Sequence, residues 1–215
     1  MAQYKDFYKE LTVEDYPQTW SKEEFENIRS FAGKLKYANN HLQRLASGSG
    51  RTVFKIDDQK VLKIAKNRKG LAQNQVESDR GIQNYGVTAK VFDVGDEIHD
   101  IGPFWIESEF CKKIGPKRFQ QLTGVTLEEV LAYMTEILEP RNHWRGNLDP
   151  KLKRRLDDNE FIIDVLRFAG DYDQQIGDYG RASTWGETIS DGKPAVVLVD
   201  FGLNRSVWND YYKVK

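Results

Sequence analysis

A continuous apolar stretch near the C-terminus ends at an acidic residue. In "KPAVVLVDFGLN", residues 193–204, the apolar run 195–199 is followed at once by Asp200, Phe201 and Gly202. A short apolar run between turn-forming residues is typical of a buried strand. Asp200 is then either the polar turn that closes the strand or a carboxylate held at the strand end to bind a metal ion. The second interpretation requires partners elsewhere in the chain.

Two charged residues in the first half of the chain are candidates for such partners. Lys63, in "KVLKIAK", lies within a β-prone run and shares one face with Val61 and Ala65 by strand alternation. Glu77 follows 14 residues later (77 − 63), in a polar segment that can form a helix. A carboxylate from a packed helix can hold a flexible lysine in place against a phosphate. The alternatives are an edge-strand lysine that discourages aggregation and a solvated glutamate.

Glycines and a second aspartate extend the set. In "ASGSGRTVF", Gly48 and Gly50 lie between two predicted strands, where backbone N–H groups can approach phosphate oxygens; an ordinary hairpin turn is the alternative. "IGDYGRAS" places Asp178 at the end of an element. Two carboxylates, one binding Mg²⁺ and one orienting a hydroxyl nucleophile, are what phosphoryl transfer requires.

Hydrophobic periodicity predicts the elements that would position these residues. We expect one helix over 19–38 with Ser21 as its N-cap, and a later helix that begins after the cap Thr126. The Asp191–Gly192 pair predicts a hairpin before the apolar run. The remaining predictions are strands near 41–46, 51–57 and 60–66, a short polar helix within 69–84, strands with a turn at 96–102, a polar connector over 139–155 and a helix within 159–172.

Composition excludes several function classes. The 215 residues carry 32 basic and 33 acidic side chains, so neither duplex nucleic acid nor an anionic membrane is an expected partner. No segment is apolar enough to span a membrane, and the N-terminus lacks the apolar core of a signal peptide. Cys111 is the only cysteine, which fits a reducing compartment. The sequence predicts a cytoplasmic globular protein.

The order of these features resembles that of the protein-kinase-like fold, which also includes aminoglycoside phosphotransferases. More closely, the chain resembles the short kinase-like proteins of tailed bacteriophages, over residues 42–203, roughly three-quarters of its length. The resemblance implies an α+β, two-lobed fold. It would comprise an N-terminal helical extension (1–40), an N-lobe with an antiparallel sheet (41–113) and a truncated, mainly helical C-lobe (114–215).

The same resemblance implies ATP and Mg²⁺ as cofactors and gives each residue a role. Gly48 and Gly50 would cover the phosphates, Lys63 would contact them and pair with Glu77, and Asp200 would bind Mg²⁺. Asp178 would be the catalytic aspartate, with Arg181 stabilising the charge of the transferred phosphate. In "ESEFC", the backbone of Glu109 and Cys111 would meet adenine, with Ser108 at the gatekeeper position.

Several departures from the family pattern accompany these matches. The third glycine of the loop is missing and Arg51 lies near its place, so a guanidinium can contact the phosphates instead. Ser183 stands five residues after Asp178, where the family has a metal-binding asparagine, and a hydroxyl is a poorer Mg²⁺ ligand. The residues after Gly202 are too few for an activation segment, so regulation by its phosphorylation is not expected.

Three functions follow as hypotheses. The first is an ATP-dependent phosphotransferase acting on a serine or threonine hydroxyl of a protein. The second is a catalytically inactive relative that binds or sequesters a partner protein, such as a host factor if the chain is phage-encoded, in which case it would act in the host cytoplasm. The third is a small-molecule kinase, which the Gly-Asp pair at 177–178 favours.

Overall fold

The computed structural model describes residues 16–98, 100–139 and 148–213. The described residues begin with a short non-helical stretch and two short helices, α1 (Lys22–Asn27) and α2 (Phe31–His41). Ser21 caps α1 as predicted, by accepting a hydrogen bond from the N–H of Glu24. The prediction of one continuous helix over 19–38 was wrong, because Ile28 has extended backbone and Ser30 caps a new helix. A second N-cap serine inside the apolar repeat was the overlooked signal.

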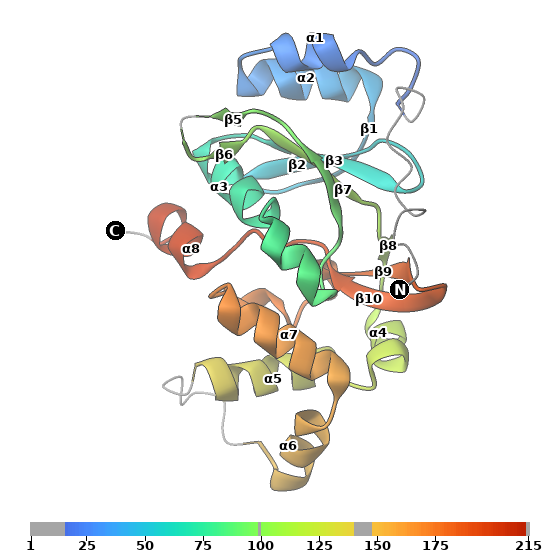
Figure 1. Ribbon diagram of the computed structural model, residues 1–215, viewed down its shortest axis with the longest axis vertical. Coiled ribbons are helices and arrows are strands. Elements are labelled where there is room, and N and C mark those ends of the chain that lie inside the picture. The colour runs from blue at the N-terminus through green and yellow to red at the C-terminus, as the bar shows by residue number, and fades with distance from the viewer. Residues whose placement is uncertain (1–15, 99, 140–147, 214–215) are drawn as a thin grey trace, which may run out of the picture.

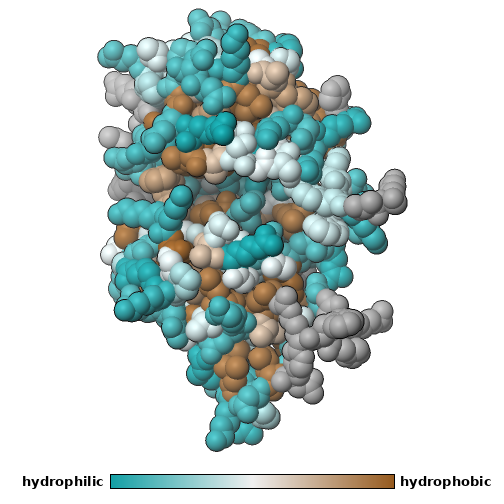
Figure 2. Space-filling model, turned by 180° about the vertical axis from the view of Figure 1, so that it is seen from behind, coloured by the Kyte–Doolittle hydropathy of each residue, from teal (hydrophilic) through white to brown (hydrophobic). Residues whose placement is uncertain are grey.

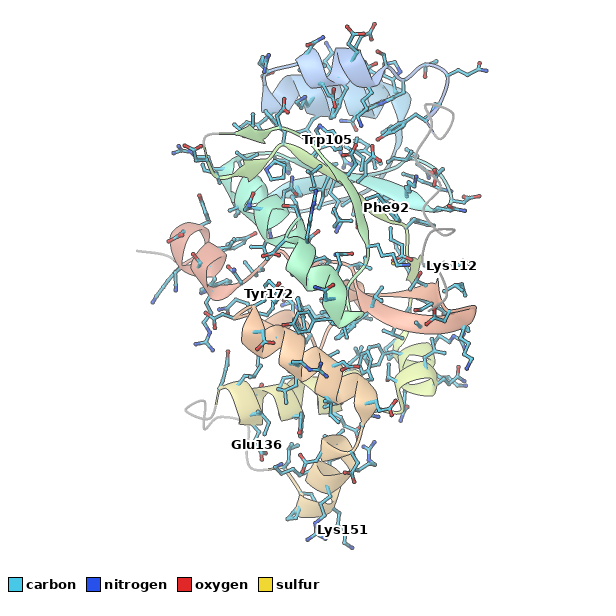
Figure 3. All side chains as sticks on the ribbon, viewed as in Figure 1. Phe92, Trp105, Lys112, Glu136, Lys151 and Tyr172 are labelled. Carbon is cyan, nitrogen blue, oxygen red and sulfur yellow. The ribbon has the colours of Figure 1, made fainter. Side chains whose placement is uncertain are left out.

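A five-stranded antiparallel sheet follows, in the order β1-β2-β3-β7-β4. Its strands are β1 (Gln43–Ser47), β2 (Arg51–Lys55), β3 (Lys60–Ala65), β4 (Val91–Val94) and β7 (Trp105–Glu109). The three strands predicted near 41–66 are confirmed. Helices α1 and α2 lie on one side of the sheet and α3 (Arg68–Glu77) lies on the other (Figure 1). Trp105, labelled in Figure 3, lies on the α1 side, where its ring centroid is 6.3 Å from that of Phe25.

Helix α3 is more buried than its polar sequence indicates. Leu71, Gln73, Asn74 and Glu77 are all buried in it. The helix ends at Glu77, and the rest of the predicted segment continues as a 3₁₀ helix over Arg80–Tyr85. The predicted turn at 96–102 lies within a small hairpin of β5 (Glu97–Ile98) and β6 (Gly102–Pro103). The polar side chains of α3 therefore face the interior, where they need hydrogen-bond partners.

The second half of the chain is mainly helical. It contains α4 (Pro116–Thr123), α5 (Leu127–Leu138), α6 (Pro150–Asp157), α7 (Glu160–Asp171) and α8 (Arg205–Tyr211). Thr126 and Glu129 form a capping box at the start of α5, as Thr126 predicts. The predicted connector over 139–155 was wrong from residue 150 onward, because Asp149 caps α6 and Pro150 is its first residue. Residues 140–147 of that connector lie outside the described residues.

A three-stranded sheet in the order β10-β9-β8 completes the fold. Strands β9 (Trp185–Ser190) and β10 (Lys193–Leu198) form the predicted hairpin, and β8 (Lys112–Lys113) pairs with β9. Asp191 and Gly192 both have positive φ, 50° and 74°, as a tight turn between two strands requires. Strand β10 begins earlier than the apolar run but buries only its last three residues.

Buried apolar side chains form two clusters, one at each end of the molecule's long axis. The first joins α1, α2 and the five-stranded sheet, and includes Trp20, Phe25, Leu62, Ile64 and Trp105. The second joins α4–α7, β9 and β10, and includes Phe119, Val130, Phe168, Trp185 and Leu198. On the face of the molecule turned away from the viewer in Figure 1, hydrophobic side chains lie in separate places among hydrophilic ones (Figure 2). In the described part of the chain, no helix is both long and apolar enough to cross a bilayer.

Candidate active site

Lys63 and Glu77 form a buried ion pair between the sheet and α3. Lys63 Nζ lies 2.6 Å from Glu77 Oε2, and the two side chains are 5% and 0% exposed. Strand β3 pairs with β2 on one side and β7 on the other, so Lys63 is not on an edge strand. The burial of Glu77 likewise excludes a solvated surface glutamate. Lys63 also donates to the C=O of Val199, 2.9 Å away.

Glu77 joins four segments of the chain through one carboxylate. Besides Lys63, it accepts hydrogen bonds from Arg51 Nη2 at 2.7 Å and from the backbone N–H groups of Phe201 and Gly202 at 3.2 and 3.0 Å. Burial alone would raise the pKa of Glu77, but the positive charges of Arg51 and Lys63 outweigh it and lower that pKa to about 2. The carboxylate is therefore ionised at neutral pH.

Arg51 points into the structure and not over the glycine turn. Its guanidinium contacts Glu77, Asp200 Oδ1 at 2.5 Å and Asn74 Oδ1 at 3.4 Å. Asn74 is itself held by donating to the C=O of Pro103 at 2.9 Å. Burial lowers the pKa of Arg51, but the charges of Glu77 and Asp200 raise it above its usual range. The inward contacts of Arg51 and Asn74 were missed at the sequence level, because nothing in the local pattern links residues 51 and 200.

The Asp-Phe-Gly segment is packed against α3. A Cβ added to Gly202 would lie 2.6 Å from the backbone oxygen of Gln73, so this contact requires glycine. Phe201 is 1% exposed and its ring lies against Phe168, with centroids 6.2 Å apart. The side chain of Asp200, by contrast, is 64% exposed. The segment is thus anchored by the two residues that directly follow an aspartate whose carboxylate reaches solvent.

The glycine turn between β1 and β2 is held by residues that follow β3. Lys66 donates from Nζ to the C=O of Gly48 at 2.8 Å and from its backbone N–H to the C=O of Gly50 at 2.7 Å. Asn67 donates to the C=O of Ser49 at 3.0 Å. Gly50 is buried against Gln73, whereas an added Cβ on Gly48 would meet nothing closer than 3.9 Å. The space beside Gly48 is compatible with a phosphate approaching the backbone.

Asp178 lies on a separate loop from Lys63, Glu77 and Asp200. Within the described residues, the structure records no hydrogen bond or ion pair from Asp178 to any of those three; its carboxylate pairs with Arg181 at 2.9 Å, and both side chains are exposed. Thr184 provides an indirect link to the strand end, because its hydroxyl donates to the C=O of Asp178 at 2.8 Å. Its own C=O accepts from the N–H of Val199 at 2.9 Å.

Ser183 precedes this linking threonine and is exposed. It lies in a 3₁₀ turn, Ala182–Thr184, directly before β9. Thr184 is buried, and sequence reasoning missed its role. The only signal for it was its place between the Gly-Asp loop and the predicted hairpin.

Residues 108–109 are the end of β7, the strand that lies between β3 and β4 in the sheet, and residues 110–111 follow that strand. Ser108 is fully buried and donates to the C=O of Lys90 at 3.0 Å, while Glu109 and Phe110 donate from their backbone N–H groups to Lys90 and Gln59. Cys111 packs against Gly186, where an added Cβ would lie 2.4 Å from Cys111 Cβ. Burial, together with the charge of Glu109, raises the pKa of the Cys111 thiol to about 12. The implied contacts of this segment with adenine stay predictions.

The residues at the strand end suit Mg²⁺ held together with phosphates. In the ranges that the structure describes, no three or more His, Cys, Asp or Glu side chains gather closely enough to hold an ion by themselves. Mg²⁺ usually takes one or two carboxylates and completes its coordination with waters and substrate phosphates. The exposed carboxylate of Asp200 is a ligand of that kind, and Lys63 retains one of its three N–H donors beyond the two contacts above.

Comparisons with known proteins do not extend this description. No protein-family model matches the chain, and no curated protein matches it. The function therefore has to be argued from the geometry of the site itself.

Proposed function

We propose that the chain is a phosphotransferase of the protein-kinase-like type that uses ATP and Mg²⁺. The observation that carries the proposal is the position of Glu77, which contacts Lys63 on the sheet and the backbone of residues 201–202 after the strand end. This contact supports the proposal, because it links a lysine that could bind phosphates to the segment that carries Asp200, which could bind a metal. A hydrogen-bonded carboxylate shared by two segments fixes their relative positions, and positioning is most of what phosphoryl transfer asks of a protein.

The proposed arrangement has two lobes with the nucleotide between them. The sheet within residues 41–113 would be the N-lobe, residues 114–215 the C-lobe and residues 1–40 an extension. The two apolar clusters support a division into two lobes, but Ile82, Val87 and Ala89 of residues 41–113 belong to the second cluster. ATP would lie under the turn at Gly48 and Gly50, with its adenine at the backbone of Glu109 and Cys111 and Ser108 behind it.

Each side chain then has a part in the transfer. Lys63 would bind phosphate oxygens, and Asp200 would hold Mg²⁺, whose charge would offset that of the phosphates. Asp178 accepts the proton of the attacking substrate hydroxyl. The oxygen of that hydroxyl forms a bond to the γ-phosphorus of ATP, as the bond between this phosphorus and the β–γ bridging oxygen breaks. Arg181, 2.9 Å from Asp178, can donate to the transferred group. Ser183 is the remaining candidate metal ligand. The substrate we propose is a serine or threonine hydroxyl of a protein.

A second function is favoured by Arg51. Its contact with Asp200 occupies one oxygen of the proposed metal ligand, and the pairing of Asp178 with Arg181 occupies the proposed base. Both contacts are compatible with an inactive kinase-like protein that binds or sequesters a partner protein. If the chain is phage-encoded, that partner would be a host protein in the host cytoplasm.

Nucleotide titration followed by a transfer assay tests the proposal. ATP is titrated calorimetrically with and without Mg²⁺, and the same sample is then assayed with radiolabelled ATP for autophosphorylation. We expect Mg²⁺-dependent transfer that Asp200→Asn abolishes. Asp164→Asn, which removes an exposed carboxylate on α7, is the control and should retain transfer.

Two outcomes would contradict the proposal. Binding of ATP with no transfer of phosphate, either to the protein itself or to a generic protein substrate, would favour the inactive binding protein. Transfer that persists in a folded Asp200→Asn variant would exclude the mechanism proposed here.

A further inference from the structure

One nitrogen of Arg51 lies where two carboxylates converge. Arg51 Nη2 is 2.7 Å from Glu77 Oε1 and 2.5 Å from Asp200 Oδ1. Metal–oxygen distances are about 2.3–2.6 Å for Ca²⁺ and about 2.0–2.1 Å for Mg²⁺. A Ca²⁺ ion placed at this nitrogen would thus be within a few tenths of an ångström of coordinating both carboxylates, and a Mg²⁺ ion within about 0.7 Å. The guanidinium fills a point at which a metal ion would otherwise fit.

The environment of Arg51 is built to keep it there. Its side chain is only 8% exposed, and its second terminal nitrogen lies 3.4 Å from Asn74 Oδ1. Asn74 is 0% exposed and is oriented by its bond to the C=O of Pro103. A planar guanidinium held through both terminal nitrogens has little freedom to swing away, because each alternative position would leave a buried charge without a partner.

Charge is balanced at this point without any metal. The cations of Arg51 and Lys63 match the carboxylates of Glu77 and Asp200, two against two. Arginine stays protonated throughout the physiological pH range, so this balance does not depend on pH or on the supply of ions. A metal ion can reach Asp200 from the solvent side, because the side chain of Asp200 is 64% exposed.

We propose that Arg51 is a built-in cation that occupies the inner metal position between Glu77 and Asp200. The site then takes at most one divalent ion, on the exposed side of Asp200. The number of metal ions that would accompany a bound nucleotide matters only if the proposed function is right, so this inference rests on that function. The exclusion of a divalent ion from the inner position by Arg51 does not require a nucleotide and can be tested without one.

Mn²⁺ binding, followed by the electron paramagnetic resonance signal of the free ion, tests the inference directly. Without nucleotide, wild-type protein should bind at most one Mn²⁺ ion, weakly, through Asp200. Arg51→Gln removes the guanidinium from between the two carboxylates and should bind Mn²⁺ at least about tenfold more tightly than wild type, because two adjacent carboxylates are better ligands than one. The gain should vanish in the double variant Arg51→Gln/Asp200→Asn.

A matched control separates this effect from a general loss of positive charge. Arg118→Met removes a cation from an exposed pair with Glu187, 2.6 Å away, and should leave Mn²⁺ affinity unchanged. Arg51→Lys keeps a charge at the position and should not gain the tenfold affinity. Circular dichroism and thermal melts establish that each variant is folded.

The outcomes that would overturn the inference are distinct from a failure of the proposed function. Equal Mn²⁺ affinity in wild type and a folded Arg51→Gln variant would exclude the built-in cation. If Arg51→Gln does not fold, wild type alone decides: two Mn²⁺ ions bound per wild-type molecule, both lost in Asp200→Asn, would show that the inner position accepts a metal despite Arg51. Absence of ATP binding would contradict the proposed function and leave these results intact.

Discussion

The backbone N–H of Gly202 donates to the carboxylate of Glu77, 3.0 Å away, and this bond ties the segment after β10 to helix α3. The same carboxylate holds Lys63 and Arg51, so sheet, helix and strand end share one acceptor. A buried group with four donors is costly to remove, because each donor would lose a partner in a place that water does not reach. The stability of the site and its chemistry therefore depend on the same residue.

Replacing Glu77 with Gln should destabilise the protein and change its response to acid. Two buried cations would lose their counter-charge, which costs on the order of 3–5 kcal/mol. The pKa of Glu77 is about 2 in the folded protein against an ordinary value of 4.5. Since the folded value is the lower, the stabilisation from Glu77 is complete above about pH 4.5 and is lost as the pH falls toward 2. Urea unfolding between pH 7 and pH 3 measures both effects.

Glu187→Gln is the control for that series. The hydrogen bond from Arg118 lowers the pKa of Glu187 as well, but this pair lies at the surface, so replacing Glu187 should remove only a small part of the acid dependence of wild type. If the Glu77→Gln protein loses stability between pH 4.5 and 3 as steeply as wild type, the acid dependence cannot be assigned to Glu77.

Adding a methyl group at Gly202 should loosen the segment from α3. In Gly202→Ala the new Cβ would lie 2.6 Å from the backbone oxygen of Gln73, and backbone must move to relieve it. Overpacking of this kind costs about 1–3 kcal/mol. Gly177→Ala is the comparison, because a Cβ there meets nothing within 4 Å and should change stability by no more than about 0.5 kcal/mol. Equal unfolding midpoints for the two variants would argue against the close contact.

Removing the hydroxyl of Tyr179 should not harm the protein. Its OH is buried and has no hydrogen-bond partner among the described residues, and burial raises its pKa. The backbone C=O of Tyr179, which accepts from Trp185 Nε1 at 2.8 Å, is unaffected by Tyr179→Phe. We expect a stability equal to wild type or up to about 1 kcal/mol higher, measured by chemical denaturation. A clear loss would mean that the hydroxyl has a partner after all.

Tyr212 should hold the C-terminal helix α8 against α3. Its hydroxyl accepts from Gln73 Nε2 at 3.2 Å, and Lys69 Nζ lies 4.3 Å from the centroid of its ring. In Tyr212→Ala, amide hydrogens of α8 should exchange faster with solvent, because both contacts are lost. Tyr211→Ala removes the adjacent, exposed ring and should leave exchange in α8 close to that of wild type. Identical exchange in the two variants would exclude this anchoring role.

The thiol of Cys111 should be unreactive in the folded protein. With a pKa of about 12, only about one molecule in ten thousand carries a thiolate at pH 8, and the thiolate is the reactive form. Iodoacetamide at pH 8 should therefore modify Cys111 only after denaturation, as followed by mass spectrometry. Rapid modification of native protein would show that residues 108–111 open to solvent.

Local structure was largely predictable from the sequence by itself. Ser21 and Thr126 cap helices, and Asp191–Gly192 turns a hairpin, because each acts on backbone groups a few residues away. The order of Lys63, Glu77 and Asp200 along the chain was also enough to predict an association among them. The two errors, at Ile28–Ser30 and at α6, arose where a cap was overlooked within a longer polar or apolar pattern.

The tertiary structure decided which charges meet. Arg51 and Asp200 are 149 residues apart, and no periodicity links them. Their contact depends on the register of β2 beside β3, on the docking of α3 and on the packing of Gly202 against Gln73, all of which are set by long-range packing. The sequence alone therefore determined which residue types are available for chemistry. The fold determined that the carboxylate of Glu77 pairs with both Lys63 and Arg51, and that Arg51 also pairs with Asp200, the proposed metal ligand.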